Sequence, residues 1–516
     1  MSEQLFKYAF IAFYLAVLVA VAFYGFHRYV LVYLYIKHRK NAYQPIARYR
    51  QLPRITIQLP MYNEDTVAER IIKATCLIDY PKELLDIQVL DDSTDQSADI
   101  ARLACDEWAA KGHPITYIHR DNREGYKAGA LAAGLKVSKG EFVAIFDADF
   151  VPPKDILHNV VDYFTDDKIG MVQVRWDHLN RDASLLTRSQ AIFLDGHFVI
   201  EHTARNRSGR FMHFNGTAGV WRRTTIDDGG GWQHDTLTED LDLSYRCQMK
   251  GWQFVYLPQY AAPAELPPEM IAFKQQAHRW TKGSMQTAIK LLPGILKSKS
   301  LPRIVKTEAF FHLTNTVVYP LMVLLTIMMY PAFVYVDGPI KHYTWGSALF
   351  SFSLFVLATC SASTFFVFAQ KELFGREAGW KSLLHLPMLM ALGVGVCVNN
   401  TKAVIEAIWS AISKTPSGEF VRTPKYGVTG RDRGQVQAQS VLTLKLLAVP
   451  IIEISFGCYM SVFMFVSMYY AFAPASIPFL LIFAGGYFYV GWSSLVVLWR
   501  MNQEAQAQIE EAEALA

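Results

Sequence analysis

Residues 142–150 read Phe142-Val143-Ala144-Ile145-Phe146-Asp147-Ala148-Asp149-Phe150, a short apolar run that ends in two aspartates. The apolar part predicts a buried strand over 142–146. A second pair, Asp91 and Asp92, follows the apolar run 87–90 in the same way. One aspartate at a strand end is usually a turn former or a helix cap. Two such pairs at neighbouring strands instead indicate a site, because ligands of open α/β sheets bind beyond the carboxyl ends of the strands.

The segments around these strands alternate between short apolar runs and helical patterns. The predicted strands are 55–59, 87–90, 115–118 and 142–146, and the predicted helices are 65–76, 99–110 and 127–137. This order is typical of an α/β domain with a parallel sheet and helices on both faces. The first strand runs into Pro60-Met61-Tyr62-Asn63-Glu64 rather than GxGxxG, and the sequence has no GxxxxGK[ST]. Dinucleotide dehydrogenases and P-loop NTPases are therefore disfavoured.

The acidic pairs also predict a metal. Like charges packed at one edge of a sheet need a cation. Hard carboxylate oxygens suit Mg²⁺ or Mn²⁺, which usually bridge to phosphate oxygens. Because alternate residues of a strand point to opposite faces, Asp147 and Asp149 can serve different partners, one a ligand and the other the metal.

Composition restricts the class of protein. Of 516 residues, 52% are hydrophobic and 19% are charged, against about 25% charged residues in soluble chains. A disordered chain, a coiled coil and an ordinary soluble enzyme are excluded. The formal charge of +4 is too small for a nucleic-acid binder that works by bulk charge. Six cysteines without a CxxC pair exclude a disulfide scaffold and a zinc ribbon.

The apolar residues are clustered into runs that predict a membrane protein. Five runs are long enough to span a bilayer, which takes about 20 residues: 8–35, 310–336, 345–368, 441–473 and 477–499. Lysines and arginines after the first run and before the second and fourth place residues 37–300 and the loop before 441 inside. The shorter run 383–398 then cannot cross, and we expect it to lie on or dip into the inner leaflet. The alternative for the first run is a cleaved signal peptide.

Two further motifs carry chemistry-bearing side chains. Thr236-Leu237-Thr238-Glu239-Asp240 opens a predicted helix, in which Thr238 could be an ordinary N-cap with acidic residues favoured by the helix dipole. In the helical pattern 267–292, Gln276, Arg279 and Trp280 share one face. That helix could equally be an amphipathic interfacial helix with its tryptophan at the headgroups, and the two readings are compatible.

Together, Asp92, Asp147–Asp149, Thr238–Asp240 and Gln276–Trp280 stand in the order of the D, DxD, [T/S]ED and QxxRW motifs. Over residues 50–430 the chain therefore resembles the processive family 2 inverting glycosyltransferases, which include the bacterial cellulose synthase catalytic subunits. The wording of 214–222 and 398–402 resembles the plant cellulose-synthase-like A and C branch of glucomannan and glucan synthases.

The resemblance implies a Rossmann-like GT-A fold, a nucleotide-sugar donor and Mg²⁺ or Mn²⁺ as cofactor. UDP-glucose and GDP-mannose are both compatible with it, and no residue decides between them. It also implies roles for individual side chains: Asp91 and Asp92 at the nucleoside, Lys127 at the phosphates, Asp147 at the donor, Asp149 at the metal, Asp240 as general base, Gln276 and Arg279 at the diphosphate, and Trp280, Gly216, Thr217 and Glu239 at the acceptor. For Lys127 alone, a surface salt bridge is an equal alternative.

Residues 418–425 resemble the FxVTxK gating loop of cellulose synthases, with Phe420, Thr423 and Lys425 in the matching positions. Arg422 replaces the valine of that motif, and a basic juxtamembrane loop is the alternative reading.

The predicted organisation follows from these segments: an N-terminal transmembrane helix (1–36), a glycosyltransferase domain facing the cytoplasm (37–263), interface helices (264–307), two transmembrane helices (308–370), an interfacial segment with the gating-like loop (371–440), two further transmembrane helices (441–500) and a cytoplasmic tail (501–516). The predicted function is a membrane-embedded processive β-glycosyltransferase that extends a β-glycan and couples synthesis to secretion, with room for export partner subunits. The rivals are an enzyme that glycosylates a membrane lipid and a transporter or receptor with a non-catalytic domain.

Overall fold

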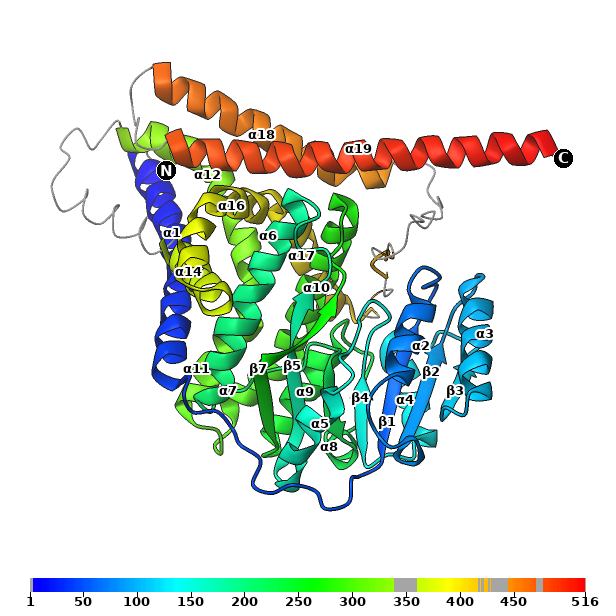
Figure 1. Ribbon diagram of the computed structural model, residues 1–516. Helices are drawn as coiled ribbons and strands as arrows, with labels where there is room; N and C mark the ends of the chain where they lie inside the picture. The colour runs from blue at the N-terminus through cyan, green and yellow to red at the C-terminus, as the bar shows by residue number, and fades with distance from the viewer. Residues whose placement is uncertain are drawn as a thin grey trace.

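The computed structural model describes residues 3–337, 360–415, 418, 422–425, 427, 444–469 and 477–515. Its centre is a seven-stranded sheet with the strand order β3-β2-β1-β4-β6-β5-β7 (Figure 1). The strands are β1 (Ile55–Met61), β2 (Leu85–Asp91), β3 (Ile115–His119), β4 (Phe142–Ile145), β5 (Ile169–His178), β6 (Gly219–Arg222) and β7 (Gln253–Ala264).

The sheet is mixed rather than wholly parallel. Strands β1 to β4 are parallel to one another, as predicted. The prediction of a parallel sheet is wrong for β6, which runs antiparallel to both β4 and β5. Strand β6 begins beside the end of β4, where Gly219 pairs with Ile145. Residues 215–217, which precede β6, therefore lie at the carboxyl end of β4.

Helices cover both faces of the sheet. Helices α2 (Ala68–Cys76), α3 (Ser97–Ala110) and α5 (Ile156–Val160) pack on one face, and α4 (Tyr126–Val137), α8 (Arg223–Asp228) and α9 (Glu239–Met249) on the other. Strand β1 supplies Ile55, Ile57 and Leu59 to the first core, because alternate side chains point to opposite faces. The remaining elements of this part are η1 (Lys82–Leu84), η2 (Val161–Thr165), α6 (Leu185–Asp195), the π-helix η3 (Gly196–His202) and α7 (Thr203–Arg207).

Strand β7 forms one edge of the sheet and is its longest strand, with 12 residues. It pairs with β5 in parallel, with a register shift between Val174 and Arg175. Pro258 and Pro263 lie within it. From β7 the chain enters α10 (Met270–Lys297), the helix that connects the sheet domain to the apolar helices.

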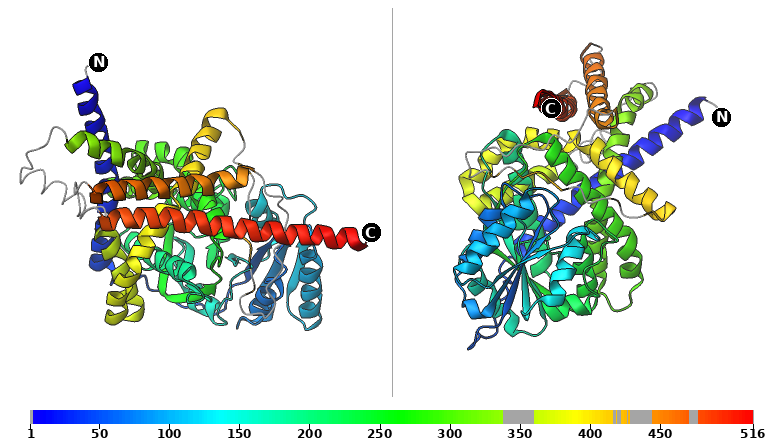
Figure 2. Two further views of the ribbon diagram at one scale, coloured as in Figure 1. Left: turned by 90° about the horizontal axis from the view of Figure 1, so that it is seen from above. Right: turned by 90° about the vertical axis from the view of Figure 1, so that its right-hand side faces the viewer.

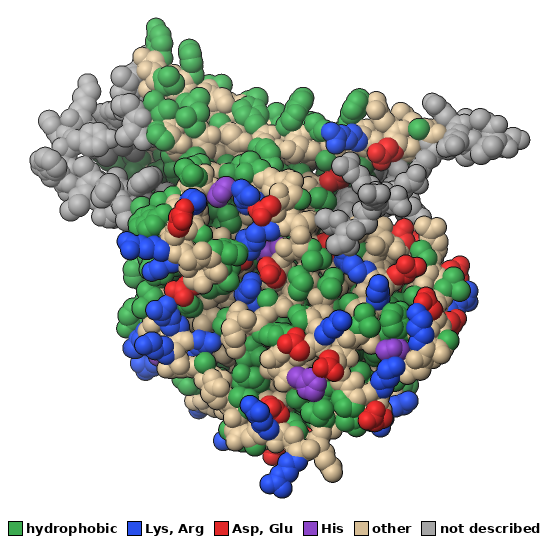
Figure 3. All heavy atoms as spheres, in the orientation of Figure 1, with side chains coloured by type: hydrophobic (Ala, Val, Ile, Leu, Met, Phe, Trp, Pro, Cys, Tyr) green, Lys and Arg blue, Asp and Glu red, His purple; other side chains and the backbone are tan. Residues whose placement is uncertain are grey.

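The apolar part of the chain is helical. Its elements are α1 (Glu3–His38), α11 (Arg303–Thr314), η4 (Asn315–Val317), α12 (Val318–Asp337), α14 (Ser361–Phe374), α15 (Arg376–Lys381), η6 (Ser382–His385), α16 (Leu386–Gly395), α17 (Cys397–Ser413), α18 (Leu444–Tyr469) and α19 (Ile477–Leu515). Helices α18 and α19 run side by side across the end of the molecule that is uppermost in Figure 1 (Figures 1 and 2). Hydrophobic side chains gather on these helices, whereas charged side chains cover the sheet domain (Figure 3).

Five helical segments of the described chain are long and apolar enough to cross a membrane: Glu3–His38, Arg303–Ala332, Arg376–Ser413, Leu446–Tyr469 and Ile477–Ala507. The number equals the predicted number of spans, but the set differs. Residues 345–359 of the predicted span 345–368 lie outside the described residues. The segment Arg376–Ser413, which contains the run expected to stay in one leaflet, is divided into four helical elements from α15 to α17. Its non-crossing path therefore stays a prediction.

Candidate active site

A cleft opens beyond the carboxyl ends of β1, β2 and β4. Its walls come from the segment after β1, the start of α4, the segment after β4, the start of α9, one face of α10 and the loop 422–425. Segments more than 350 residues apart in the chain therefore meet at one point, as Glu64 and Arg422 illustrate with 3.5 Å between their charged groups.

Lys127 lies at the centre of the cleft. As the second residue of α4, it reaches from a helix N-terminus, and its Nζ lies 2.5 Å from Asp147 Oδ1 and 2.9 Å from the Gly216 carbonyl oxygen. Burial alone would lower the pKa of Lys127, but Asp147 and Glu239 raise it. The ammonium is therefore charged, and it forms the salt bridge considered above with Asp147, inside the cleft rather than at the surface.

Asp149 is a second carboxylate of the cleft and is held by a different lysine. Its side chain is 7% exposed, and its Oδ2 accepts a hydrogen bond from Lys425 Nζ at 2.6 Å. The ammonium thus stands against a hard carboxylate oxygen, the kind of group that binds Mg²⁺ or Mn²⁺. Glu64 lies close by, and burial raises its pKa to about 8 even though Lys425 and Arg422 lower it.

The two aspartates at the end of β2 separate. Asp92 lines the cleft and forms a two-point ion pair with Arg120, at 2.7 and 2.5 Å. Asp91 is fully buried and accepts hydrogen bonds from the Ser93 and Tyr117 hydroxyls at 2.5 and 2.7 Å. Asp91 therefore holds the loop after β2 and does not line the cleft, because neighbouring strand residues point to opposite faces.

The start of α9 supplies a carboxylate with a shifted pKa. Burial and the neighbouring Glu239 carboxyl raise the pKa of Asp240 to about 7. Glu239 is 7% exposed, and burial raises its pKa as well. Two adjacent carboxyl groups in one cleft cannot both ionise freely, so one of them is available as a proton acceptor near neutral pH.

Thr238 does not act as the ordinary helix cap considered above. It occupies the N-cap position, but its hydroxyl makes no capping bond within the described chain. The Thr238 Oγ1 atom instead lies 3.2 Å from Thr287 Oγ1 on α10. At Gly283, also on α10, an added Cβ would lie 2.5 Å from Thr238 Cγ2. The threonine therefore fixes the start of α9 against α10, which carries Gln276, Arg279 and Trp280 into the cleft.

The structure thus brings most of the predicted site residues together. The cleft is lined by Asp92, Lys127, Asp147, Asp149, Gly216, Glu239, Asp240, Gln276, Arg279, Trp280, Thr423 and Lys425. Thr217 lies behind it, buried, and its hydroxyl accepts the Asp147 N–H at 2.8 Å. Phe420 lies outside the described residues.

Several cleft residues were not singled out in the sequence. Glu64 and Tyr62 stand in the segment after β1, which was noted only for lacking the glycines of a dinucleotide site. The Arg123 guanidinium lies 3.5 Å from the centre of the Tyr62 ring. Asn215 lines the cleft beside Gly216. A tyrosine and a glutamate just after a buried strand were the available signal, since strand ends of this kind carry ligand contacts.

Comparison with known proteins agrees with this geometry. Residues 53–283 match the family model described as "Glycosyltransferase like family 2". The matched region contains the whole mixed sheet and most of the residues that line the acidic cleft. The chain is similar to proteins described as glucomannan 4-beta-mannosyltransferases of plants.

Three such relatives illustrate the similarity. The probable glucomannan 4-beta-mannosyltransferase 4 of Oryza sativa subsp. japonica is 44% identical over 254 residues, 48% of this chain and 46% of that protein. Glucomannan 4-beta-mannosyltransferase 7 of Arabidopsis thaliana is 42% identical over the same 254-residue length. The Cyamopsis tetragonoloba glucomannan 4-beta-mannosyltransferase 1 is 39% identical over 294 residues, 55% of this chain and 56% of that protein. The chain spans about half the length of the curated relatives it matches.

Among solved structures, the mannosyltransferase PcManGT from Pyrobaculum calidifontis, in complex with GDP-Man and Mn²⁺, aligns with a TM-score of 0.49 at 21% identity. The alignment covers 72% of this chain and 98% of that chain.

Proposed function

We propose that this protein is a membrane-embedded processive β-mannosyltransferase, which moves mannose from GDP-mannose to the end of a growing β-glycan with inversion. The names of the plant relatives support mannose as the transferred sugar, and GDP-mannose is the mannose donor among the two that the sequence resemblance allows. One observation carries the chemistry: at Gly216, an added Cβ would lie 3.1 Å from Asp240 Oδ2 and 3.4 Å from Lys127 Nζ. The candidate base and the candidate phosphate-binding cation therefore border the same space at Gly216, which a side chain at this position would crowd.

The residues divide the work of one displacement. Asp240 takes the proton from the attacking hydroxyl of the acceptor as the new glycosidic bond forms. The bond from the sugar to the diphosphate breaks on the opposite face of the anomeric carbon, and the nucleoside diphosphate departs with the electron pair. Lys127 and Arg279 neutralise the charge that develops on it. Asp92 and Arg120 lie where the nucleoside would bind.

The residues at Asp149 fit a divalent cation. A buried carboxylate that already holds the Lys425 ammonium at 2.6 Å is suited to a cation of higher charge. Mg²⁺ and Mn²⁺ bind through one or two carboxylates plus phosphate oxygens, so Asp149 with the donor would suffice. When bound, the metal would supply further charge neutralisation at the diphosphate.

The acceptor side faces the apolar helices. Trp280 on α10 lines the cleft and is 36% exposed, so a flat aromatic face is open to a sugar ring. The same helix packs through Met285 and Ala288 against a core that also contains Val404 of α17. A product held at Trp280 therefore grows next to the helices that would carry it across the bilayer with the domain on the cytoplasmic side.

The test is release of nucleoside diphosphate by the purified full-length protein, with Mn²⁺ or Mg²⁺ and either GDP-mannose or UDP-glucose. We expect GDP release with a long product that a β-mannanase degrades. Asp240→Asn should lose turnover and still bind donor, whereas the exposed Asp99→Asn should match the wild type. Release from UDP-glucose alone, turnover by Asp240→Asn, or one sugar added per lipid molecule would each contradict the proposal.

A further inference from the structure

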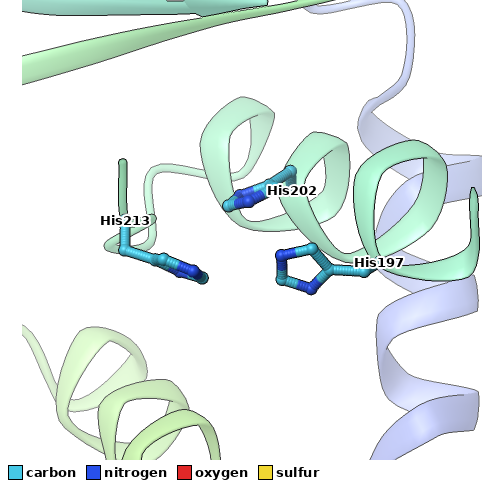
Figure 4. Close-up of side chains that lie close together, drawn as sticks. All are labelled: His197, His202 and His213. Carbon is cyan, nitrogen blue, oxygen red and sulfur yellow. The ribbon is translucent and has the colours of Figure 1, made fainter. Parts of the chain in front are cut away.

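Three histidines gather beside the cleft without being part of the chemistry assigned above. His197 and His202 belong to η3, and His213 belongs to the segment before β6 (Figure 4). The ring centres of His197 and His202 lie 4.4 Å apart, and those of His202 and His213 lie 4.9 Å apart. His202 is fully buried. Such a cluster is costly in a protein interior unless its nitrogens find partners.

The π-helical turn creates the cluster. An α-helix directs residues five apart to different faces, whereas the i→i+5 bonding of a π-helix places them nearly above one another. His197 and His202 are five residues apart, and both rings point toward His213 (Figure 4). Wide helical turns of this kind occur mostly at functional sites.

The Asn215 side chain binds all three imidazoles. Its Oδ1 accepts a hydrogen bond from His202 Nε2 at 2.6 Å. Its Nδ2 donates to His197 Nε2 at 3.1 Å and to His213 Nε2 at 3.0 Å. One carbonyl and two N–H groups thus meet one donor and two acceptors, so each polar atom of the amide has a complementary partner.

Two of the histidines have no other polar role. The Nδ1 atoms of His202 and His213 have no hydrogen-bond partner among the residues that the structure describes. Burial, together with the neighbouring histidines and Arg205, lowers the pKa of both rings well below the usual range. These neutral, half-satisfied imidazoles therefore depend on Asn215 as their polar partner, because an unpaired buried nitrogen is unfavourable.

Asn215 connects the cluster to the active site through the backbone. The next residue, Gly216, accepts a hydrogen bond from Lys127 and has a φ of 80°, in the left-handed region. Thr217 follows and accepts the Asp147 N–H. A rotation of the Asn215 backbone would therefore shift the groups that hold Lys127 and Asp147.

We propose that His197, His202 and His213 are positioning residues, which clamp the Asn215 amide and so hold residues 215–217 beside the base and the phosphate-binding cation. This inference rests on the function proposed above. The clamp acts on the geometry of the chemical step, because Asn215 is joined directly to Gly216 and Thr217, which bind Lys127 and Asp147.

The same three histidines also have the composition of a metal site, with ligand atoms within 4.8 Å of one another. Tetrahedral zinc with Zn–N bonds of about 2.0–2.1 Å holds its ligands roughly 3.4 Å apart. Each Nε2 atom is moreover already engaged by Asn215. The amide clamp is therefore the reading that the geometry favours.

The test compares His202→Phe with His202→Gln in the full-length protein. Phenylalanine fills the space without an N–H, whereas the glutamine amide can still donate to Asn215 Oδ1. We expect His202→Phe to lower kcat by about 10- to 100-fold, the range for a misplaced reacting group, with the KM for donor changed by less than about twofold. His202→Gln should recover most of the lost kcat.

Ile200→Ala is the matched control, because Ile200 is equally buried on the same helix but packs on the side of α1 and α14. It should lower the unfolding temperature without the loss of kcat. With an active wild type, two results would overturn the clamp. One is a folded His202→Phe variant with the kcat of the wild type, and the other is a loss of kcat in Ile200→Ala as large as that in His202→Phe. A stoichiometric transition metal in the wild type that His202→Phe removes would overturn it too. An inactive wild type would instead refute the proposed function.

Discussion

At the scale of single residues, the site depends on groups whose charge the cleft itself sets. Asp240 and Glu239 share one buried environment, and the pKa of Asp240 rises to about 7. Lys127 stays charged because acidic partners offset the effect of burial. The same cleft therefore holds a carboxyl group that can take a proton and an ammonium that keeps its own.

The pH dependence of turnover follows from the raised pKa of Asp240. Below about pH 7 the carboxyl is protonated and cannot accept a proton, so kcat/KM should rise about tenfold per pH unit up to about pH 7 and then level off. Glu239→Gln removes the nearest negative charge and should move this limb to lower pH. A pH–rate profile of the wild type and this variant checks it, and a limb that does not move would show that another group titrates.

The sequence predicted the site residues that carry motifs, since carboxylates after buried strands are visible in a single chain. It could not predict which of two adjacent aspartates faces the cleft. Asp91 and Asp92 differ only in the direction of their side chains, and the register of β2 decides that direction. Glu64 and Asn215 were missed because their roles arise from contacts with residues far away in the chain.

At the scale of elements, residues 422–425 and helix α10 form one wall of the cleft. Lys425 reaches Asp149, and its carbonyl oxygen accepts a hydrogen bond from the Thr66 hydroxyl at 3.1 Å. Strands β1 to β4 and the helices between them were predicted within a few residues. Strands β5 to β7 were not predicted. Strand β6 is short and antiparallel, and β7 is interrupted by prolines, so neither has the uniform apolar run of the first four strands.

Lys425 competes for the carboxylate that a divalent cation would use. Lys425→Ala should therefore tighten Mn²⁺ binding in the absence of donor by roughly tenfold, equivalent to about 1.4 kcal/mol. Electron paramagnetic resonance of free Mn²⁺ measures this directly. Lys111→Ala, which removes an exposed charge from the end of α3, should leave Mn²⁺ binding unchanged. Weaker binding in Lys425→Ala would mean that the lysine supports the metal instead.

At the scale of the whole molecule, a buried ion pair joins helix α10, which lines the cleft, to the apolar helices. Lys274 of α10 lies 2.8 Å from Glu453 of α18, and both side chains are at most 8% exposed. The Lys274 carbonyl oxygen also accepts a hydrogen bond from Asn399 of α17. Helix α10, which presents Arg279 and Trp280, is thus attached to two apolar helices at a single residue, Lys274.

Breaking this pair should destabilise the assembly of the two parts. Lys274→Met leaves an unpaired buried carboxylate, so we expect a loss of about 3–5 kcal/mol in the free energy of unfolding. The double variant Lys274→Met/Glu453→Leu should recover most of it, because neither charge is then left alone. Thermal unfolding in detergent, followed by tryptophan fluorescence, measures both. Equal losses in the single and double variants would argue against the pair.

The prolines of β7 have a consequence for molecules crowded together in a bilayer. An open sheet edge invites a strand from a neighbouring chain to extend the ladder, and this is a common route to aggregation. Pro258 and Pro263 have no N–H to offer, which is why prolines are tolerated at such edges. Other outer groups of β7 are already bonded, by the Asn206 side chain at Phe254 and Tyr256 and by the Val151 N–H at Pro263. Densely packed copies of this protein would therefore be protected against aggregation through this edge.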